Sequence, residues 1–131
     1  MKNGVLFISP SAEDAHTLSE MLARIAVPFE HTEDIHRTRQ KLKTDVFGAV
    51  LTEARLADGN WLDVLRLVGE TRSGAAVVVT DQLADARFWA DVLDCGAYDL
   101  LPKPFCCREV HRILSNALRE PPQLRRAAPA A

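Results

Sequence analysis

The sequence predicts an α/β fold built on a doubly wound, five-stranded parallel sheet. Short apolar runs alternate five times with longer amphipathic segments, which is the pattern of successive strand and helix units. The apolar runs are unbroken, as in residues 5–8 and 75–80, which indicates strands covered by helices on both faces. A chain of 131 residues suits one domain with a single hydrophobic core.

The first half of the chain is expected to hold three strands and three helices. Ser11 followed by Asp14 resembles a capping box, which places the start of the first helix at residue 12. The second strand carries proline and charge, so we expect it near a sheet edge. The expected elements are strands at 5–8, 28–31 and 48–52 and helices at 12–26, 34–43 and 60–71, the last with Leu62, Leu65 and Val68 facing inward.

The second half is expected to complete the sheet with two more strands. Gly96 suits a left-handed cap just past a helix, which places the end of the fourth helix at Asp94. Residues 121–131 are rich in proline and alanine and have no apolar period, so we expect a flexible tail or the start of a linker. The expected elements are strands at 75–80 and 98–101 and helices at 83–94 and 108–119.

The composition favours a protein as the binding partner and argues against nucleic acids and membranes. The formal net charge of -2 argues against direct nucleic-acid binding and against a membrane-binding surface. The first apolar run is far shorter than the apolar region of a signal peptide or a membrane span, so we expect a cytoplasmic protein. Cys106, Cys107 and His111 suggest a metal site, but a structural site wants four well-spaced ligands, so we expect reduced thiols and no metal there.

Polar side chains follow the predicted strands at the points where these strands end. Ser9 and Pro10 follow the first strand, Glu53 the third, Thr80 the fourth and Lys103 the fifth. In a doubly wound sheet, functional groups gather at the carboxyl ends of the strands. We therefore expect the Lys103 ammonium to lie opposite the Glu53 carboxylate, with the Thr80 hydroxyl donating into the same hydrogen-bond set.

Residues 5–118 resemble the receiver domain of two-component response regulators, of the chemotaxis type. The resemblance implies a flavodoxin-like (βα)5 sheet with strand order 2-1-3-4-5, a receiver domain over residues 1–120, and a cis peptide bond before Pro104. The motifs that carry it are Val79-Thr80, Gly96-Ala97-x-Asp99, Lys103-Pro104-Phe105 and the segment 53–60, which is similar to the family's stretch that begins with the phosphate-accepting aspartate.

The resemblance also shows where the chain departs from the family. Thr80 and Lys103 match the residues that contact the phosphate, whereas Glu53 occupies the acceptor position and Ser9 and Pro10 occupy the place of the magnesium-binding acidic pair. A neutral hydroxyl and a proline are poor ligands for magnesium, which prefers carboxylates. We therefore expect magnesium binding to be lost or weak, no other cofactor, and no ordinary aspartyl phosphorylation.

Several alternatives remain open at this point. Glu53 either imitates a phosphoryl group by reaching Lys103 and Thr80, or forms an ion pair in a disused pocket. A replacement acceptor, such as Asp58 or Asp81, would restore phosphotransfer or ligand sensing. Glu13 and Asp14 are candidate metal ligands, but their place in the first turn of a helix favours capping and dipole roles.

The resemblance implies a partner surface formed by the fourth helix, the fifth strand and the fifth helix. Phe88 and Trp89 are adjacent and cannot both point inward, so one of them is expected on this surface. Tyr98 and Leu100 lie two residues apart and are expected on the same side of the strand. All four are candidate interface residues.

Taken together, these patterns predict a non-enzymatic, atypical receiver that acts by phosphorylation-independent protein interaction. The expected partner is a histidine kinase, an output domain or another receiver, and a homodimer would use the surface of the fourth helix, fifth strand and fifth helix. The alternatives are a receiver with unusual phosphotransfer or ligand sensing, or the N-terminal regulatory domain of a longer DNA-binding regulator.

Overall fold

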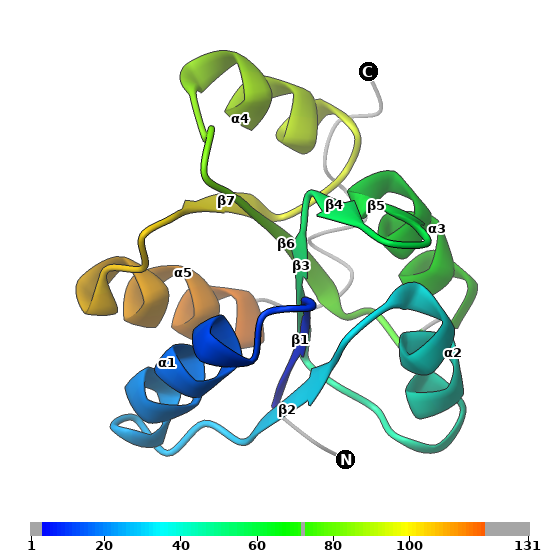
Figure 1. The fold of residues 1–131 in the computed structure, drawn as a ribbon, viewed down its shortest axis with the longest axis horizontal. Helices are drawn as coiled ribbons and strands as arrows, with labels where there is room; N and C mark the ends of the chain where they lie inside the picture. The colour runs from blue at the N-terminus through cyan, green and yellow to red at the C-terminus, as the bar shows by residue number, and fades with distance from the viewer. Residues whose placement is uncertain (1–3, 72, 120–131) are drawn as a thin grey trace.

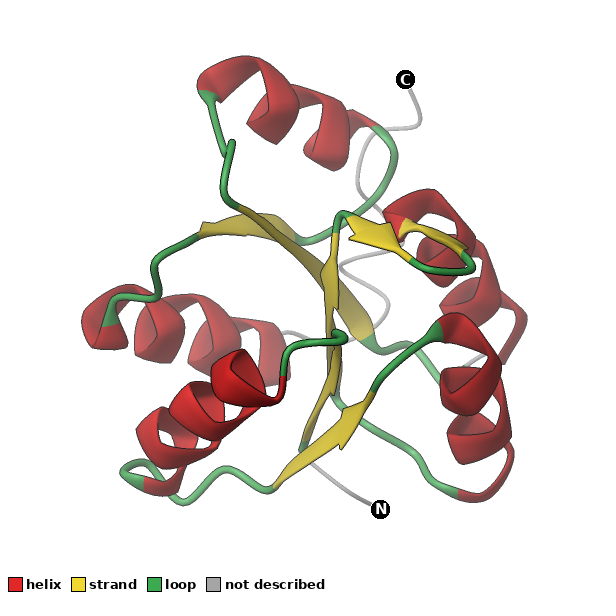
Figure 2. Cartoon of the chain, viewed as in Figure 1, coloured by secondary structure: helices red, strands yellow, loops and turns green. Residues whose placement is uncertain are grey.

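The computed structural model of the chain describes residues 4–71 and 73–119, so the predicted tail at 121–131 lies outside the described residues. Strands and helices alternate along the chain, and an extra pair of short strands precedes α3 (Figures 1 and 2). The elements are β1 (Val5–Ile8), α1 (Ala12–Ala23), β2 (Phe29–Thr32), α2 (Ile35–Thr44), β3 (Ala49–Glu53), β4 (Arg55–Leu56), β5 (Gly59–Asn60), α3 (Trp61–Thr71), β6 (Ala76–Asp81), α4 (Ala86–Asp94), β7 (Asp99–Pro102) and α5 (Cys107–Arg119).

The main sheet has five parallel strands in the order β2-β1-β3-β6-β7. This is the order 2-1-3-4-5 once the short strands β4 and β5 are set aside, so the predicted fold class is confirmed. The second strand lies at an edge, as its proline and charged residues indicated. The order reverses between β1 and β3, and the strand ends at that point converge on one edge of the sheet.

Helices cover both faces of the sheet (Figure 1). The helices α1 and α5 pack together on one face, and α2 packs with α3 on the other, where α4 extends the layer over β7. Strand β1 shows the consequence, because all four of its residues are buried. Val5 and Phe7 belong to the core under α1 and α5, whereas Leu6 and Ile8 belong to the core on the opposite face.

Side-chain caps set the first residue of three helices. Ser11, Asp34 and Asp85 each accept a hydrogen bond from the backbone N–H three residues further on. The fourth helix therefore begins at Ala86, and its predicted start at residue 83 is wrong because Asp85 caps it there. The first helix ends at Ala23, earlier than predicted, and Ala26 has a positive φ of 55°.

The predicted inner face of the third helix is wrong in part. Leu62 is 41% exposed, whereas Trp61, Val64 and Leu67 are buried together with Val68. The helical period allows either set, because the two sets are offset by about one residue. The Trp61 indole packs edge-on against Phe88 at a centroid distance of 6.0 Å. This contact favours burial of the helix face that carries Trp61.

A short hairpin of β4 and β5 lies between β3 and α3, where no strand was predicted (Figure 2). Gly59 has a φ of +158°, and a Cβ at this position would lie 2.6 Å from both Asp63 Oδ2 and Ile35 Cδ1. Glycine therefore lets the hairpin approach the first turns of α2 and α3 closely. Two-residue strands are too short to produce an apolar period, which explains why the sequence pattern did not reveal them.

Candidate functional site

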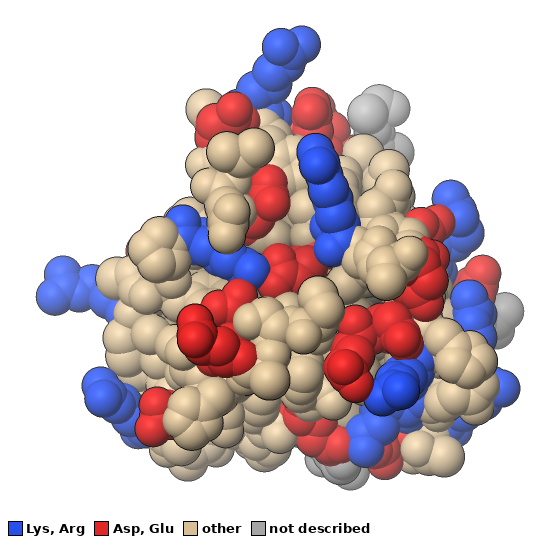
Figure 3. All heavy atoms as spheres, viewed as in Figure 1, with Lys and Arg blue, Asp and Glu red and all other residues tan. Residues whose placement is uncertain are grey.

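The predicted polar residues meet at the carboxyl end of the parallel sheet. Ser9 directly follows β1, Glu53 is the last residue of β3, Thr80 is the penultimate residue of β6, and Lys103 directly follows β7. Glu53 and Thr80 are register partners on adjacent strands. Acidic side chains gather near the middle of the face drawn in Figure 3, with basic side chains beside them.

Glu53 is held by two hydrogen-bond donors that share one carboxylate oxygen. The Ser9 hydroxyl donates to Glu53 Oε2 over 2.7 Å, and the Lys103 ammonium donates to the same oxygen over 2.5 Å. The side chains of Glu53 and Lys103 are only 12% and 13% exposed, so water screens this ion pair less than one on the surface. The predicted opposition of Glu53 and Lys103 is therefore present in the structure.

Asp14 is a third member of this network, which the sequence did not reveal. The Lys103 ammonium donates to Asp14 Oδ2 over 2.8 Å. The backbone of Asp14 behaves as predicted, because its N–H donates to the capping hydroxyl of Ser11. Its side chain, however, reaches across to the loop after β7, a contact that depends on how α1 and α5 pack and that no spacing in the sequence signals.

The network fixes the charge of Lys103. Burial by itself lowers the pKa of the ammonium, but the hydrogen bonds from Lys103 to Asp14 and Glu53 outweigh burial and hold the pKa above its ordinary value of 10.5. The lysine is therefore a permanent cation at neutral pH. One ammonium facing two carboxylates leaves the trio with a formal charge of one negative unit.

The backbone around Lys103 is held as well. Its N–H donates to the carbonyl of Asp81 at the end of β6 over 3.2 Å, and its ammonium lies 6.0 Å from the centre of the Phe105 ring. The peptide bond between Lys103 and Pro104 is cis, as the resemblance implied.

The expected role of Thr80 in the hydrogen-bond set is wrong. The residue is fully buried, and its hydroxyl has no hydrogen-bond partner among the described residues. Glu53 directs its Oε2 atom to Ser9 and Lys103, and the carboxylate makes no hydrogen bond with the threonine hydroxyl. The hydroxyl of the neighbouring Thr52, by contrast, donates to the Glu53 carbonyl over 2.9 Å.

The residues present do not fit a magnesium ion. Ser9 has already committed its hydroxyl proton to Glu53, and Pro10 is exposed and has no side-chain oxygen. The Ser9 oxygen also accepts the backbone N–H of Ser11 over 3.0 Å. Within residues 4–71 and 73–119, no three His, Cys, Asp or Glu side chains are grouped so that they could hold a metal ion.

The two candidate replacement acceptors lie in different settings. Asp58 belongs to the turn of the β4–β5 hairpin, and its two carboxylate oxygens accept the backbone N–H groups of Ile35 and His36, each over 3.0 Å. Burial by itself raises the pKa of Asp58, but these hydrogen bonds outweigh burial and hold the pKa below its ordinary value of 3.8. Asp58 is thus a cap for α2, whereas Asp81 stands at the end of β6 beside the network.

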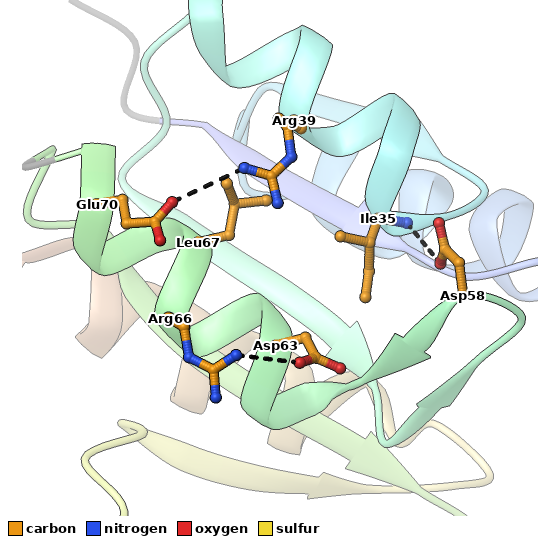
Figure 4. A pocket seen from close by; sticks show the side chains of 7 residues that line it. All are labelled: Ile35, Arg39, Asp58, Asp63, Arg66, Leu67 and Glu70. Carbon is orange, nitrogen blue, oxygen red and sulfur yellow. Dashed lines mark hydrogen bonds and ion pairs between the residues drawn. The ribbon is translucent and has the colours of Figure 1, made fainter.

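Asp58 also borders a surface hollow of about 230 Å³ between α2 and α3 (Figure 4). Figure 4 shows Arg39 of α2 facing Glu70 of α3 across the hollow, at 3.8 Å, and Arg66 paired with Asp63 on α3, at 3.4 Å. These side chains are largely exposed, so such pairs add little to stability. The residues that line the hollow are Ile35, Arg39, Asp58, Asp63, Arg66, Leu67 and Glu70.

The candidate interface residues separate into exposed and buried members. Trp89 is 48% exposed and its indole N–H donates to Asp99 Oδ1 over 2.9 Å, whereas Phe88 packs against the core with Trp61. The prediction that one of the pair faces outward is confirmed.

The placement of the other two candidates needs correction. Leu100 is only 5% exposed, so it is a core residue and cannot serve as an interface residue. Tyr98 packs against the core under α1 and α5, whereas Leu100 lies in the core that includes Trp61. Their predicted shared side is wrong because Tyr98 precedes β7, and strand alternation does not extend to it.

Known structures share this fold across almost the whole chain. The beryllofluoride-activated NtrC4 receiver domain dimer matches with a TM-score of 0.81 at 18% identity and covers 88% of this chain and 96% of its own. A putative response regulator from Chloroflexus aurantiacus matches with a TM-score of 0.82 at 16% identity, over 92% of this chain and 100% of its own. Chemotaxis response regulator CheY4 of Vibrio cholerae reaches 0.78 at 14% identity, over 89% and 99%.

Two curated proteins are also similar in sequence. Response regulator protein PilR of Pseudomonas aeruginosa is 23% identical over 114 residues, which make up 87% of this chain and 26% of that protein. DNA-binding transcriptional regulator NtrC of Proteus hauseri is 28% identical over 106 residues, which make up 81% of this chain and 21% of that protein. No family model matches the chain.

The chain therefore has the fold of these receiver domains and response regulators, and it is similar in sequence to two longer bacterial regulators. The chain spans about a quarter of the length of the curated relatives it matches. No helix in the described part of the chain combines the length and the apolar character needed to cross a membrane.

Proposed function

We propose that this receiver domain is a non-catalytic signalling module that acts in the cytoplasm through protein contacts and without phosphorylation of Glu53. The observation that carries the proposal is the occupied carboxylate oxygen, because Glu53 Oε2 already accepts from Ser9 and Lys103. An acceptor must present a free, correctly placed oxygen to the phosphoryl donor, and the transfer needs a metal to neutralise developing charge. Here Glu53 Oε2 is already occupied, and Ser9 and Pro10 supply no carboxylate for such a metal.

The partner in this proposal is a histidine kinase, an output domain or another receiver. The relatives support this range, since one is described as a receiver domain dimer, one as a response regulator and one as a DNA-binding transcriptional regulator, and the last two are longer than this chain. The exposed Trp89 is the candidate anchor on the surface of α4, β7 and α5, because a large aromatic side chain buries much area at low entropy cost.

Glu53 acts in this proposal as one partner of a structural ion pair and does not imitate a phosphoryl group. A phosphate mimic would engage Thr80 as well as Lys103, and the Thr80 hydroxyl has no partner among the described residues. A group that makes the same contacts in both states of a domain shifts no population. Replacing Glu53 with Gln should therefore leave the affinity for a partner receiver or kinase unchanged.

A second candidate is the regulatory domain of a longer DNA-binding regulator. It is favoured by NtrC of Proteus hauseri, whose description names a DNA-binding transcriptional regulator of which this chain covers only 21%. In this case the protein contacts would be made to an output domain in the same polypeptide.

The test is incubation of the purified domain with a small phosphodonor and magnesium, followed by intact-mass measurement at neutral pH. We expect no phosphoryl adduct, since Glu53 Oε2 is held by Ser9 and Lys103 and the acidic pair that would bind the metal is replaced by Ser9 and Pro10. A stable single adduct, mapped to Glu53, Asp58 or Asp81, would overturn the proposal. The known receiver CheY4 of Vibrio cholerae, treated in parallel, serves as the control for the donor chemistry.

A further inference from the structure

We propose that the Lys103 ammonium is a built-in cation that holds Asp14 and Glu53 together and replaces a divalent metal in organising this edge of the sheet. The proposal concerns how the site is assembled, so it stands or fails separately from the proposed function. It follows from the contacts of one nitrogen atom with side chains of two different elements, α1 and β3.

The geometry is that of a bridging cation. Lys103 Nζ lies 2.8 Å from Asp14 Oδ2 and 2.5 Å from Glu53 Oε2. An ammonium carries three N–H donors, so two are used to join the carboxylates. Asp14 and Glu53 are 39 positions apart in the sequence, and the lysine links the start of α1 to the end of β3. Charge-assisted hydrogen bonds of this kind are roughly twice as strong as neutral ones.

Burial makes a cation necessary at this place. The side chains of Asp14 and Glu53 are 27% and 12% exposed, so both carboxylates have lost much of their hydration. Carboxylates brought close together in a poorly hydrated site repel each other unless a positive charge compensates. In the described structure Lys103 supplies that charge from within the chain.

A divalent ion would have to displace this lysine. It would break two charge-assisted hydrogen bonds and the bond from the Ser9 hydroxyl to Glu53 Oε2. In return, the site offers the ion two carboxylates and otherwise only neutral oxygen atoms such as that of Ser9. The exchange is unfavourable for a hard cation that dehydrates reluctantly. Removing the ammonium should reverse this balance, because Asp14 and Glu53 would then face each other without compensation.

The experiment is a calorimetric titration of the domain with Mg²⁺ and, separately, Mn²⁺ at constant ionic strength, for the wild type and Lys103→Met. We expect no saturable binding by the wild type up to the highest metal concentration used, and saturable Mn²⁺ binding by Lys103→Met with a dissociation constant at least roughly tenfold below that concentration. The matched control is Lys43→Met, which removes an exposed lysine and should leave the wild-type result unchanged. The double variant Lys103→Met with Glu53→Gln should lose the gained binding.

Each outcome decides the matter. Saturable Mg²⁺ binding by the wild type at submillimolar concentration overturns the proposal, and so does a folded Lys103→Met that binds Mn²⁺ no better than the wild type. If circular dichroism shows that Lys103→Met does not fold alone, Mn²⁺ should restore its structure, and failure to do so equally overturns the proposal. If the mass experiment shows a phosphoryl adduct while the calorimetric titration of the wild type shows no metal binding, the proposed function is wrong and this inference still holds.

Discussion

Glu53 and Thr80 are register partners on adjacent parallel strands, yet the Glu53 carboxylate bonds to Lys103 and the Thr80 hydroxyl bonds to no described residue. The two side chains thus share no hydrogen-bond network. Lys103 belongs to an ionic network with Asp14, whereas Thr80 is part of the buried interior. This division leads to several measurable consequences.

Replacing Thr80 with Val should raise the free energy of unfolding or leave it unchanged. A buried hydroxyl without a hydrogen-bond partner costs on the order of 1–3 kcal/mol. Valine has nearly the same shape as threonine and removes this hydroxyl. Urea unfolding followed by circular dichroism measures the change. The matched control is Thr52→Val, because Thr52 is equally buried but its hydroxyl donates to the Glu53 carbonyl, so this variant should lose stability. Equal losses in both variants would show that the Thr80 hydroxyl is bonded.

The contribution of Lys103 to stability should disappear at alkaline pH. Its pKa is raised in the folded domain above the ordinary value of 10.5, so the unfolded chain loses this proton first. The stabilisation is therefore complete below about pH 10.5 and is lost as the pH rises through the folded-state pKa. The difference in unfolding free energy between wild type and Lys103→Met should be constant near neutral pH and shrink above pH 10.5. A difference that grows with pH would contradict this assignment.

Asp58→Asn should destabilise the domain by weakening the cap on α2. The two carboxylate oxygens accept one backbone N–H each at the helix start, whereas an asparagine amide has one accepting oxygen and would turn its NH₂ group toward the other N–H. Because the pKa of Asp58 is lowered below 3.8, its stabilisation is present above that pH and is lost as the pH falls through the folded-state value. Unfolding at pH 7 and at pH 2 tests both parts. Asp91→Asn, on the exposed face of α4, is the control and should change little.

Trp89→Ala should weaken any self-association of the domain. The indole is about half exposed and stands on α4, so it offers apolar area for a second copy to bury. Sedimentation velocity over a range of protein concentrations measures the dissociation constant of the dimer. Leu62→Ala is the control, because Leu62 is similarly exposed on α3. If Leu62→Ala weakens association and Trp89→Ala does not, the interface lies on another face.

Most of the fold followed from local patterns. Unbroken apolar runs located β1 and β6, the weaker patterns at 28–31, 48–52 and 98–101 located the other strands of the main sheet, and the capping box at Ser11 and Asp14 located the start of α1. The error in the buried face of α3 arose because the sequence pattern fits two helix faces equally well. Helix α3 could bury either of two faces, and the packing of Trp61 against Phe88 decided between them.

The sequence predicted only those residues of the candidate site that stand at the ends of the parallel strands. Ser9, Glu53, Thr80 and Lys103 were expected together because parallel strands end at a common edge, and they lie there. The pairing of Asp14 with Lys103 joins residues 89 positions apart, and the capping of α2 by Asp58 joins residues 22 and 23 apart. Neither contact leaves a periodic signal, because each depends on how separate elements pack.

The alternation of strands and helices, their burial between two layers and the identity of the strand-end residues are thus properties of the sequence pattern, since periodic burial dictates them locally. The order of the strands in the sheet came from the family resemblance. The choice of hydrogen-bond partners belongs to the tertiary structure. Whether the Glu53 carboxylate turns to Lys103 or to Thr80 depends on small differences in distance and burial between side chains from four elements. Those differences exist only after the helices have packed on the sheet, because charge-assisted hydrogen bonds form only at short range.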